Sequence, residues 1–291
     1  MSDTLILILS MSACLVGTII RKIYTEKSPG GLRWLYLFNI ICSLLPCGIL
    51  LAWDGIGTVS LFTVLLACLF GLVTVAQTVF NLKALEAGPM SYTNVICSFS
   101  TVISALSGAM FFGETLNAMH IIGMVLMAGS FLLAVEKKAG QKSTGIRWLA
   151  YCIITFVCTG SIGIMQKVHQ SSAYKAELTA FLVIAFAVSA LASLPLLLAA
   201  PKGENKLDRK TLWLLIGCLV LSGISIALNN KWNLYLSGVM DSAVFFPIVN
   251  GGGMVLNTLA AVALFRDKPS KLQWLGIALG IASVIFLCDP F

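Results

Sequence analysis

The side chains that could do chemistry in this sequence are carboxamides set inside apolar segments. The stretch from Asn229 to Asn257 holds five asparagines, one lysine, one proline and three consecutive glycines. Amides in a hydrocarbon environment need hydrogen-bond partners, so they face a bundle interior or water rather than lipid. Asn229 and Asn233 are four residues apart and share one helix face. The pattern favours a polar cavity for a solute, with hydrogen bonding between helices as the alternative.

We expect a polar neutral or zwitterionic solute to bind the amides of this cavity, with an aromatic ring covering its apolar part. The predicted lining residues are Gln77, Asn81, Tyr92, Asn94, Asn229, Asn230, Asn233, Phe246 and Asn250.

Charged residues and helix breakers add further candidates. Lys231 inside a span must pair, lose its proton or bind an anion, whereas at a helix end it would reach the interface. Pro247 removes a backbone hydrogen bond and Gly251, Gly252 and Gly253 weaken the helix, so these four residues are the predicted hinge.

Acids and cations at predicted helix ends have simpler expected roles. Glu114 and Asp267 are expected to cap the fifth and tenth helices, because an acid favours a helix N-terminus, with a role in gating as the alternative. Lys167 and His169 are expected to end the sixth helix at the membrane interface.

Motifs for other chemistry do not occur. The sequence has no P-loop, GxGxxG or HExxH motif, its nine cysteines form no CxxC pair, and its two histidines lie far apart. A disulfide framework and a zinc site are therefore unsupported. We expect no cofactor, no metal and no enzymatic activity.

Composition indicates a polytopic membrane protein. The 291 residues are 58% hydrophobic and 11% charged, against roughly 45–50% and 25% in soluble domains. Long continuous apolar runs favour helices over a barrel, in which polar and apolar residues alternate. The net charge of +7 is a topology signal and not a nucleic-acid-binding surface, because the charges lie between the apolar runs.

Ten apolar runs are long enough to be membrane spans, which need roughly 20 residues each. They cover residues 4–23, 34–53, 59–82, 89–112, 117–135, 147–166, 178–200, 211–232, 240–265 and 271–288. The first lacks the basic start of a signal peptide and is expected to be retained.

Lysine and arginine fall mostly in the connections after odd-numbered spans, beginning with Arg21, Lys22, Lys27 and Arg33. By the positive-inside rule, both termini are predicted to be extracytoplasmic in a multi-pass protein of the plasma (inner) membrane.

The two halves of the chain match each other. Residues 114–123 (ETLNAMHIIG) resemble 267–276 (DKPSKLQWLG) at an offset of 153, and Gln77-x3-Asn81-Leu82 resembles Asn229-x3-Asn233-Leu234 at 152. Five spans per copy reverse the orientation of the second, so residues 1–138 and 139–291 are predicted to be inverted five-helix repeats. Transporters use this arrangement, with the binding site between the copies.

Four segments resemble the EamA-type ten-span members of the drug/metabolite transporter superfamily. They are NLKALEAGPMSYTN (81–94), FFGETLNAMHIIGMVLMAGSFLL (111–133), GSIGIMQK (160–167) and LFRDKPSKLQWLGIALGIASVIFL (264–287). The resemblance implies a central cavity lined by spans one, three, four, six, eight and nine, and it is silent on the substrate. The first span lacks the family's tryptophan-glycine signature, and Arg266-Asp267 stands where glycine-glutamate is usual.

The sequence therefore predicts a secondary transporter that moves a small polar organic metabolite, such as an amino acid, by alternating access. The alternatives are a non-transporting membrane scaffold or receptor, in which the amides satisfy one another, and an intramembrane enzyme. The expected partners are a small-molecule substrate and the lipid bilayer, with no nucleic acid. Four glycines in the fifth and tenth spans also suit a homodimer face: Gly123, Gly129, Gly276 and Gly280.

Overall fold

The computed structural model describes residues 2–29, 31–87, 90–133, 145–201, 208–265 and 270–287. Within these ranges, a few side chains inside helices also lie outside the description: Met90, Ser91, Tyr92, Asn94, Val95, Ala261 and Phe265.

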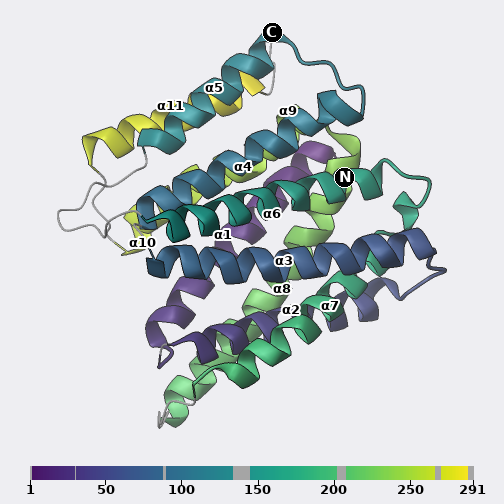
Figure 1. Cartoon of the computed structure of the whole chain (residues 1–291), viewed down its shortest axis with the longest axis vertical. Coiled ribbons are helices and arrows are strands. Elements are labelled where there is room, and N and C mark those ends of the chain that lie inside the picture. The colour runs from purple at the N-terminus through teal and green to yellow at the C-terminus, as the bar shows by residue number, and fades with distance from the viewer. Residues whose placement is uncertain are drawn as a thin grey trace. The chain divides into compact units, whose positions relative to one another are not determined.

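All regular structure in the described ranges is helical, which confirms the predicted helical class. The elements are α1 (Asp3–Lys27), α2 (Leu32–Asp54), α3 (Leu61–Ala87), α4 (Met90–Phe111), α5 (Ala118–Leu133), α6 (Ile146–Gln170), η1 (Lys175–Glu177), α7 (Leu178–Ala199), α8 (Arg209–Val239), α9 (Ser242–Pro247), η2 (Ile248–Gly252), α10 (Gly253–Phe265) and α11 (Lys271–Leu287). They follow the predicted apolar runs closely (Figure 1).

Seven helical segments in the described ranges are long and apolar enough to cross a membrane. Three further apolar helices are shorter: Ile96–Phe111, Ala118–Leu133 and Lys271–Leu287. The chain thus has the character of a membrane-embedded helical protein.

The chain forms two compact units. One contains Met1–Val75 and Ser172–Leu236, and the other contains Ala76–Ser171 and Ser237–Phe291. Each unit draws helices from both halves of the sequence, and α3 and α8 contribute to both units. The repeat boundary between residues 138 and 139 stays a prediction about sequence duplication.

In the first unit, α2 packs along α7 (Figure 1). An apolar cluster joins α1, α2 and α8 through the buried residues Ile20, Tyr24, Phe38, Cys42, Leu215, Cys218 and Leu219. The Tyr24 hydroxyl donates to the Trp34 carbonyl oxygen at 3.2 Å, so its polar end is satisfied while its ring is buried. This packing holds the C-terminal part of α1 against α8.

In the second unit, α5 packs along α11 (Figure 1). Two hydroxyl-to-carbonyl hydrogen bonds join these helices reciprocally: Ser130 Oγ donates to Gly276 O, and Ser283 Oγ donates to Gly123 O, both at 2.7 Å. At Gly123, an added Cβ would lie 2.6 Å from Leu287 Cγ. The small residues therefore allow a close contact within the chain, as they do between membrane helices. The homodimer face stays a prediction.

Candidate functional site

Two of the predicted amides form a closed hydrogen-bond ring in the first unit. Ser10 Oγ donates to Asn233 Oδ1 at 2.7 Å, and Asn233 Nδ2 donates to Asn229 Oδ1 at 3.3 Å. Asn229 Nδ2 closes the ring by donating to Ser10 Oγ at 3.2 Å and to Ser10 O at 3.0 Å. The ring fastens α1 to α8. Both amide hydrogens of Asn229 are used within it.

A pocket of about 160 Å³ opens beside Asn229. On α1 its lining residues follow helical spacing: Ala13, Cys14, Gly17, Thr18 and Arg21. On α8 they do the same: Ser222, Ser225, Ile226 and Asn229. Phe38 of α2 completes the wall. The pocket therefore lies between one face of α1 and one face of α8.

Gly17 sets the approach of the two helices at this pocket. A Cβ at Gly17 would lie 3.3 Å from Ser225 Cβ, so a larger residue there would crowd α8. Beyond this contact, Arg21 places its guanidinium carbon 5.7 Å from the centre of the Phe38 ring. Phe38 itself is only 3% exposed, which makes it a fixed platform for the cation.

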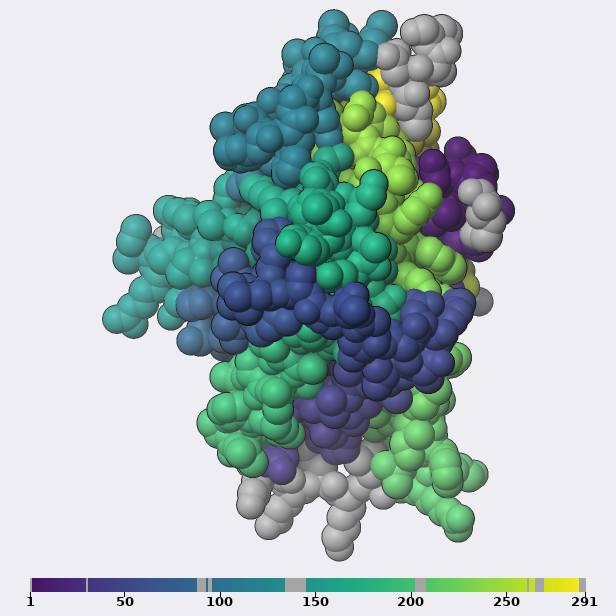
Figure 2. Space-filling view, turned by 90° about the vertical axis from the view of Figure 1, so that its right-hand side faces the viewer, coloured from purple at the N-terminus to yellow at the C-terminus, as the bar shows by residue number. Residues whose placement is uncertain are grey.

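Lys231 pairs with an acid and not with the amide ring. Its Nζ lies 2.6 Å from Asp54 Oδ2 and 4.4 Å from the centre of the Trp53 ring. The same carboxylate oxygen accepts a hydrogen bond from Thr179 Oγ1 at 2.6 Å. The Lys231 and Asp54 side chains are 24% and 29% exposed. The segment joining α2 to α3, indigo in Figure 2, lies at the surface. Lys231 was predicted to pair, to lose its proton, to bind an anion or to reach the interface, and the structure shows the ion pair.

The other predicted amides are not brought into the ring. Asn230 Nδ2 donates to Ile226 O of its own helix at 2.9 Å. In the second unit, Gln77 Oε1 accepts from the neighbouring Thr78 hydroxyl at 3.5 Å, and Asn81 Nδ2 approaches Cys97 Sγ at 3.8 Å. Asn250 is exposed.

Of the two predicted aromatic residues, Tyr92 and Phe246, only Phe246 has a described side chain. Phe246 is buried, with its ring edge-on to Phe245 at a centroid distance of 5.0 Å. The side chains of Tyr92 and Asn94 lie outside the described part of the structure.

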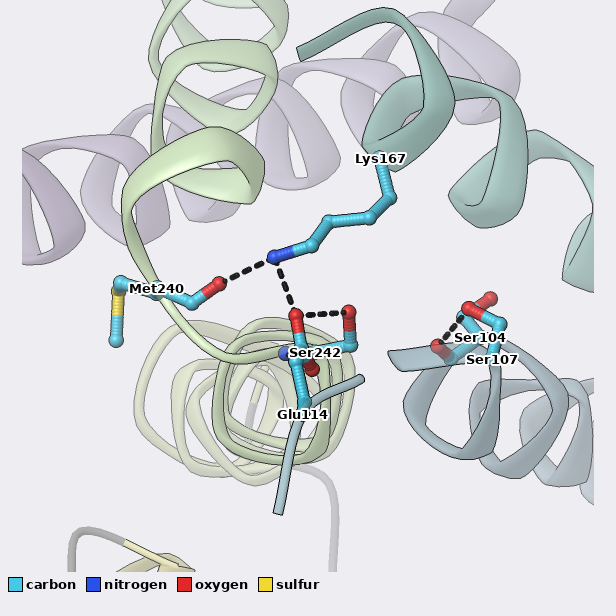
Figure 3. Close-up of polar contacts among 6 residues, drawn as sticks. All are labelled: Ser104, Ser107, Glu114, Lys167, Met240 and Ser242. Atoms are coloured by element: carbon cyan, nitrogen blue, oxygen red, sulfur yellow. Dashed lines mark hydrogen bonds and ion pairs between the residues drawn. The ribbon is translucent and has the colours of Figure 1, made fainter. Parts of the chain in front are cut away.

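A buried ion pair is the main feature of the second unit that sequence reasoning missed. Lys167 Nζ lies 2.6 Å from Glu114 Oε1, and the two side chains are only 8% and 9% exposed (Figure 3). Lys167 also donates to the Met240 carbonyl oxygen at 2.9 Å. Glu114 accepts from Ser242 N at 2.6 Å and from Ser242 Oγ at 3.2 Å. The pair joins the end of α6 to the segment before α5 and to the start of α9.

This geometry corrects one expectation and adds a partner for Lys167. The expectation that Glu114 caps the fifth helix is wrong, because α5 begins only at Ala118 and Asn117 Oδ1 accepts from His120 N there at 2.8 Å. Asp267, the other expected cap, lies outside the described residues. Glu114 instead satisfies a free N–H at the start of α9, where a carboxylate also suits the helix dipole. Lys167 and His169 do lie in the last turn of α6, as predicted, and Lys167 is buried in the ion pair. Their place at the membrane interface stays a prediction.

The predicted hinge coincides with a change of helix type. The ninth segment is α-helical to Pro247, π-helical over Ile248–Gly252 and α-helical again from Gly253. A Cβ at Gly251 would collide with the Met127 thioether, whereas one at Gly253 would meet nothing within 4 Å. Single π-helical turns are frequent at functional sites. Movement at this turn stays a prediction.

Fold and sites together define an all-helical protein of membrane type, and a comparison with a solved structure agrees on the fold. No family model matches the chain. It is 24% identical over 224 residues to an uncharacterized protein of Haemophilus influenzae, a match that covers 75% of this chain and 72% of that protein. A solved crystal structure of a protein matches 98% of this chain and 96% of its own with a TM-score of 0.76 at 18% identity. At that identity the likeness shows the fold alone.

Proposed function

We propose that the chain is a secondary transporter that moves a small polar organic solute across the plasma (inner) membrane by alternating access. In this proposal all ten apolar segments cross the membrane as two inverted five-helix repeats of EamA type. Both termini are then extracytoplasmic, as the distribution of lysine and arginine predicts.

The observation that carries the proposal is the reciprocal contact between α5 and α11. Ser130 donates to Gly276, and Ser283 donates to Gly123. The two serines are 153 residues apart in the sequence, and so are the two glycines. That is the offset at which residues 114–123 match 267–276 in sequence. Exchange of equivalent bonds is what a two-fold relation between duplicated halves produces. Inverted duplicated halves are a hallmark of secondary transporters.

Two further features agree with alternating access. The chain has two compact units, which suits a mechanism in which one body rocks against another. The predicted hinge residues lie at the π-helical turn, a point where a helix can bend.

A ligand screen followed by a matched pair of variants tests the proposal. A bound solute raises the melting temperature of the purified protein by mass action. Amino acids, nucleosides, quaternary amines, sugar phosphates and monocarboxylates form the screen. The response to a hit should be lost in the double variant Asn229→Ala/Asn233→Ala, because the hydrogen-bond ring that holds α1 against α8 beside the pocket is then removed. It should be kept in Asn230→Ala, because Asn230 bonds only its own helix.

A second candidate, a non-transporting scaffold or receptor, is favoured by the amide ring itself. Ser10, Asn229 and Asn233 satisfy one another as interhelical contacts do. This candidate predicts that proteoliposomes take up no solute of the screen faster than empty liposomes. A transporter predicts saturable uptake of at least one stabilising solute.

A further inference from the structure

We propose that the pocket between α1 and α8 is a subsite for a small organic monocarboxylate with an apolar body, and that Arg21 and Ser222 bind its carboxylate. The inference rests on the proposed transport function and narrows its substrate class. It replaces the broad expectation of a neutral or zwitterionic solute with an anionic one.

Arg21 supplies the positive charge. Among the described residues it is the only charged residue that lines the pocket, and its guanidinium has no carboxylate partner and lies over the Phe38 ring. A guanidinium keeps its charge at any relevant pH and presents donors in a fork that matches a carboxylate. The Arg21 side chain is exposed at the pocket wall, so a ligand that enters the pocket can reach its guanidinium. The pocket beside Arg21 has room for such a ligand.

Ser222 supplies a second donor. The residue is 1% exposed, it lines the same pocket, and its Oγ has no hydrogen-bond partner among the described residues. Buried hydroxyls without a partner are rare in native proteins and call for an explanation. A carboxylate oxygen of a ligand would accept the hydrogen of Ser222.

Two neighbouring polar side chains are already hydrogen-bonded within the protein. Asn229 uses both amide hydrogens on Ser10, and Thr18 Oγ1 donates to Cys14 O at 3.0 Å. The donors that remain are Arg21 and Ser222, with the Ser225 hydroxyl on the same wall, and among the described residues the lining holds no aspartate or glutamate to pair with an ammonium group. This charge distribution selects an anion over an amino acid zwitterion or an amine.

The rest of the pocket determines the size of the ligand body. Ala13, Gly17, Phe38 and Ile226 are apolar or lack side-chain polar groups. A volume of about 160 Å³ is close to that of an engineered cavity of ~150 Å³ that binds benzene. Benzoate therefore serves as a probe of the right charge and size. Benzamide and benzylamine have nearly the same shape but are neutral and cationic.

The test measures melting temperatures of the full-length protein in detergent with each probe. Benzoate should raise the melting temperature in a saturable way, and benzamide and benzylamine should not. Arg21→Gln should weaken benzoate binding by more than about tenfold, because a charge-assisted bond is lost. Arg209→Gln, which removes an equal charge at the exposed start of α8, should leave it unchanged.

The variant Ser222→Ala keeps the proposal testable if Arg21→Gln fails to fold. Removing a hydroxyl that has no partner should not destabilise the free protein, yet benzoate should bind about three- to tenfold more weakly. Equal responses to benzoate and benzamide, full binding in Arg21→Gln, or no response to benzoate up to its solubility limit would overturn the proposal.

Flux into proteoliposomes separates this inference from the proposed function. Saturable transport of another solute, without binding of or competition by benzoate, contradicts the monocarboxylate subsite alone. Binding of benzoate that depends on Arg21, without flux of any solute, contradicts the transport function and leaves the subsite standing.

Discussion

Replacing Glu114 with glutamine removes one charge from the buried pair and changes almost nothing in volume. The glutamine oxygen can still accept from Ser242 N, but Lys167 is left with only the Met240 carbonyl oxygen as its partner. With the two side chains 8% and 9% exposed, water cannot replace the lost carboxylate. Breaking a buried pair in this way typically costs about 3–5 kcal/mol, and we expect Glu114→Gln to lie in that range.

A double-mutant cycle isolates the pair from general effects of substitution. Lys167→Met removes the ammonium and keeps the apolar stem, so it leaves Glu114 as the uncompensated charge. The double variant Glu114→Gln/Lys167→Met leaves no buried charge at this site. It should lose at least about 1 kcal/mol less than the sum of the single losses, because residues in direct contact are not additive.

The assay is reversible unfolding in mixed detergent micelles, with the apparent free energy of unfolding as the readout. A cost below about 1 kcal/mol for Glu114→Gln, the value typical of exposed pairs, would refute the reasoning. Strict additivity in the cycle would show that Glu114 and Lys167 act independently.

Three other substitutions have expected outcomes in the same unfolding assay or in transport. Lys231→Met should cost at most about 1 kcal/mol, because its pair with Asp54 is partly exposed; a loss as large as that of Glu114→Gln would contradict this ranking. Gly123→Ala should destabilise the protein by about 1–3 kcal/mol, because the new Cβ would crowd Leu287. At Gly129 the nearest neighbour of a new Cβ would lie 3.8 Å away, so Gly129→Ala should be neutral or stabilising. Equal effects at the two glycines would argue against close packing of α5 on α11. Gly252→Leu should stop solute uptake without preventing membrane insertion, and normal uptake would remove the case for a hinge at the π-helical turn.

The sequence was sufficient for features that depend on local composition. Continuous apolar runs predicted the helices within a few residues, because burial or lipid contact on all sides demands such runs. Pro247 and the three following glycines predicted an irregularity, and the π-helical turn lies there. Asn229 and Asn233 were predicted to share a face, and they do bond each other.

Pairings between distant segments could not be predicted in the same way. Ser10 closes the amide ring from more than 200 residues away, and a single serine in an apolar helix carries no signal of its partner. Glu114 and Lys167 each resemble ordinary residues of helix ends, so their mutual burial depends on tertiary packing. Arg21 was assigned to a connection from its charge, whereas α1 continues to Lys27 and places Arg21 at the pocket.

Uptake into proteoliposomes tests the central claim, transport, most directly. The purified chain is reconstituted, and a radiolabelled solute that raises its melting temperature is supplied outside. We predict saturable uptake that exceeds that of empty liposomes, persists in Asn230→Ala and is lost in Asn229→Ala/Asn233→Ala. A solute that binds and stabilises the wild-type protein, yet enters no faster than into empty liposomes, would contradict the account.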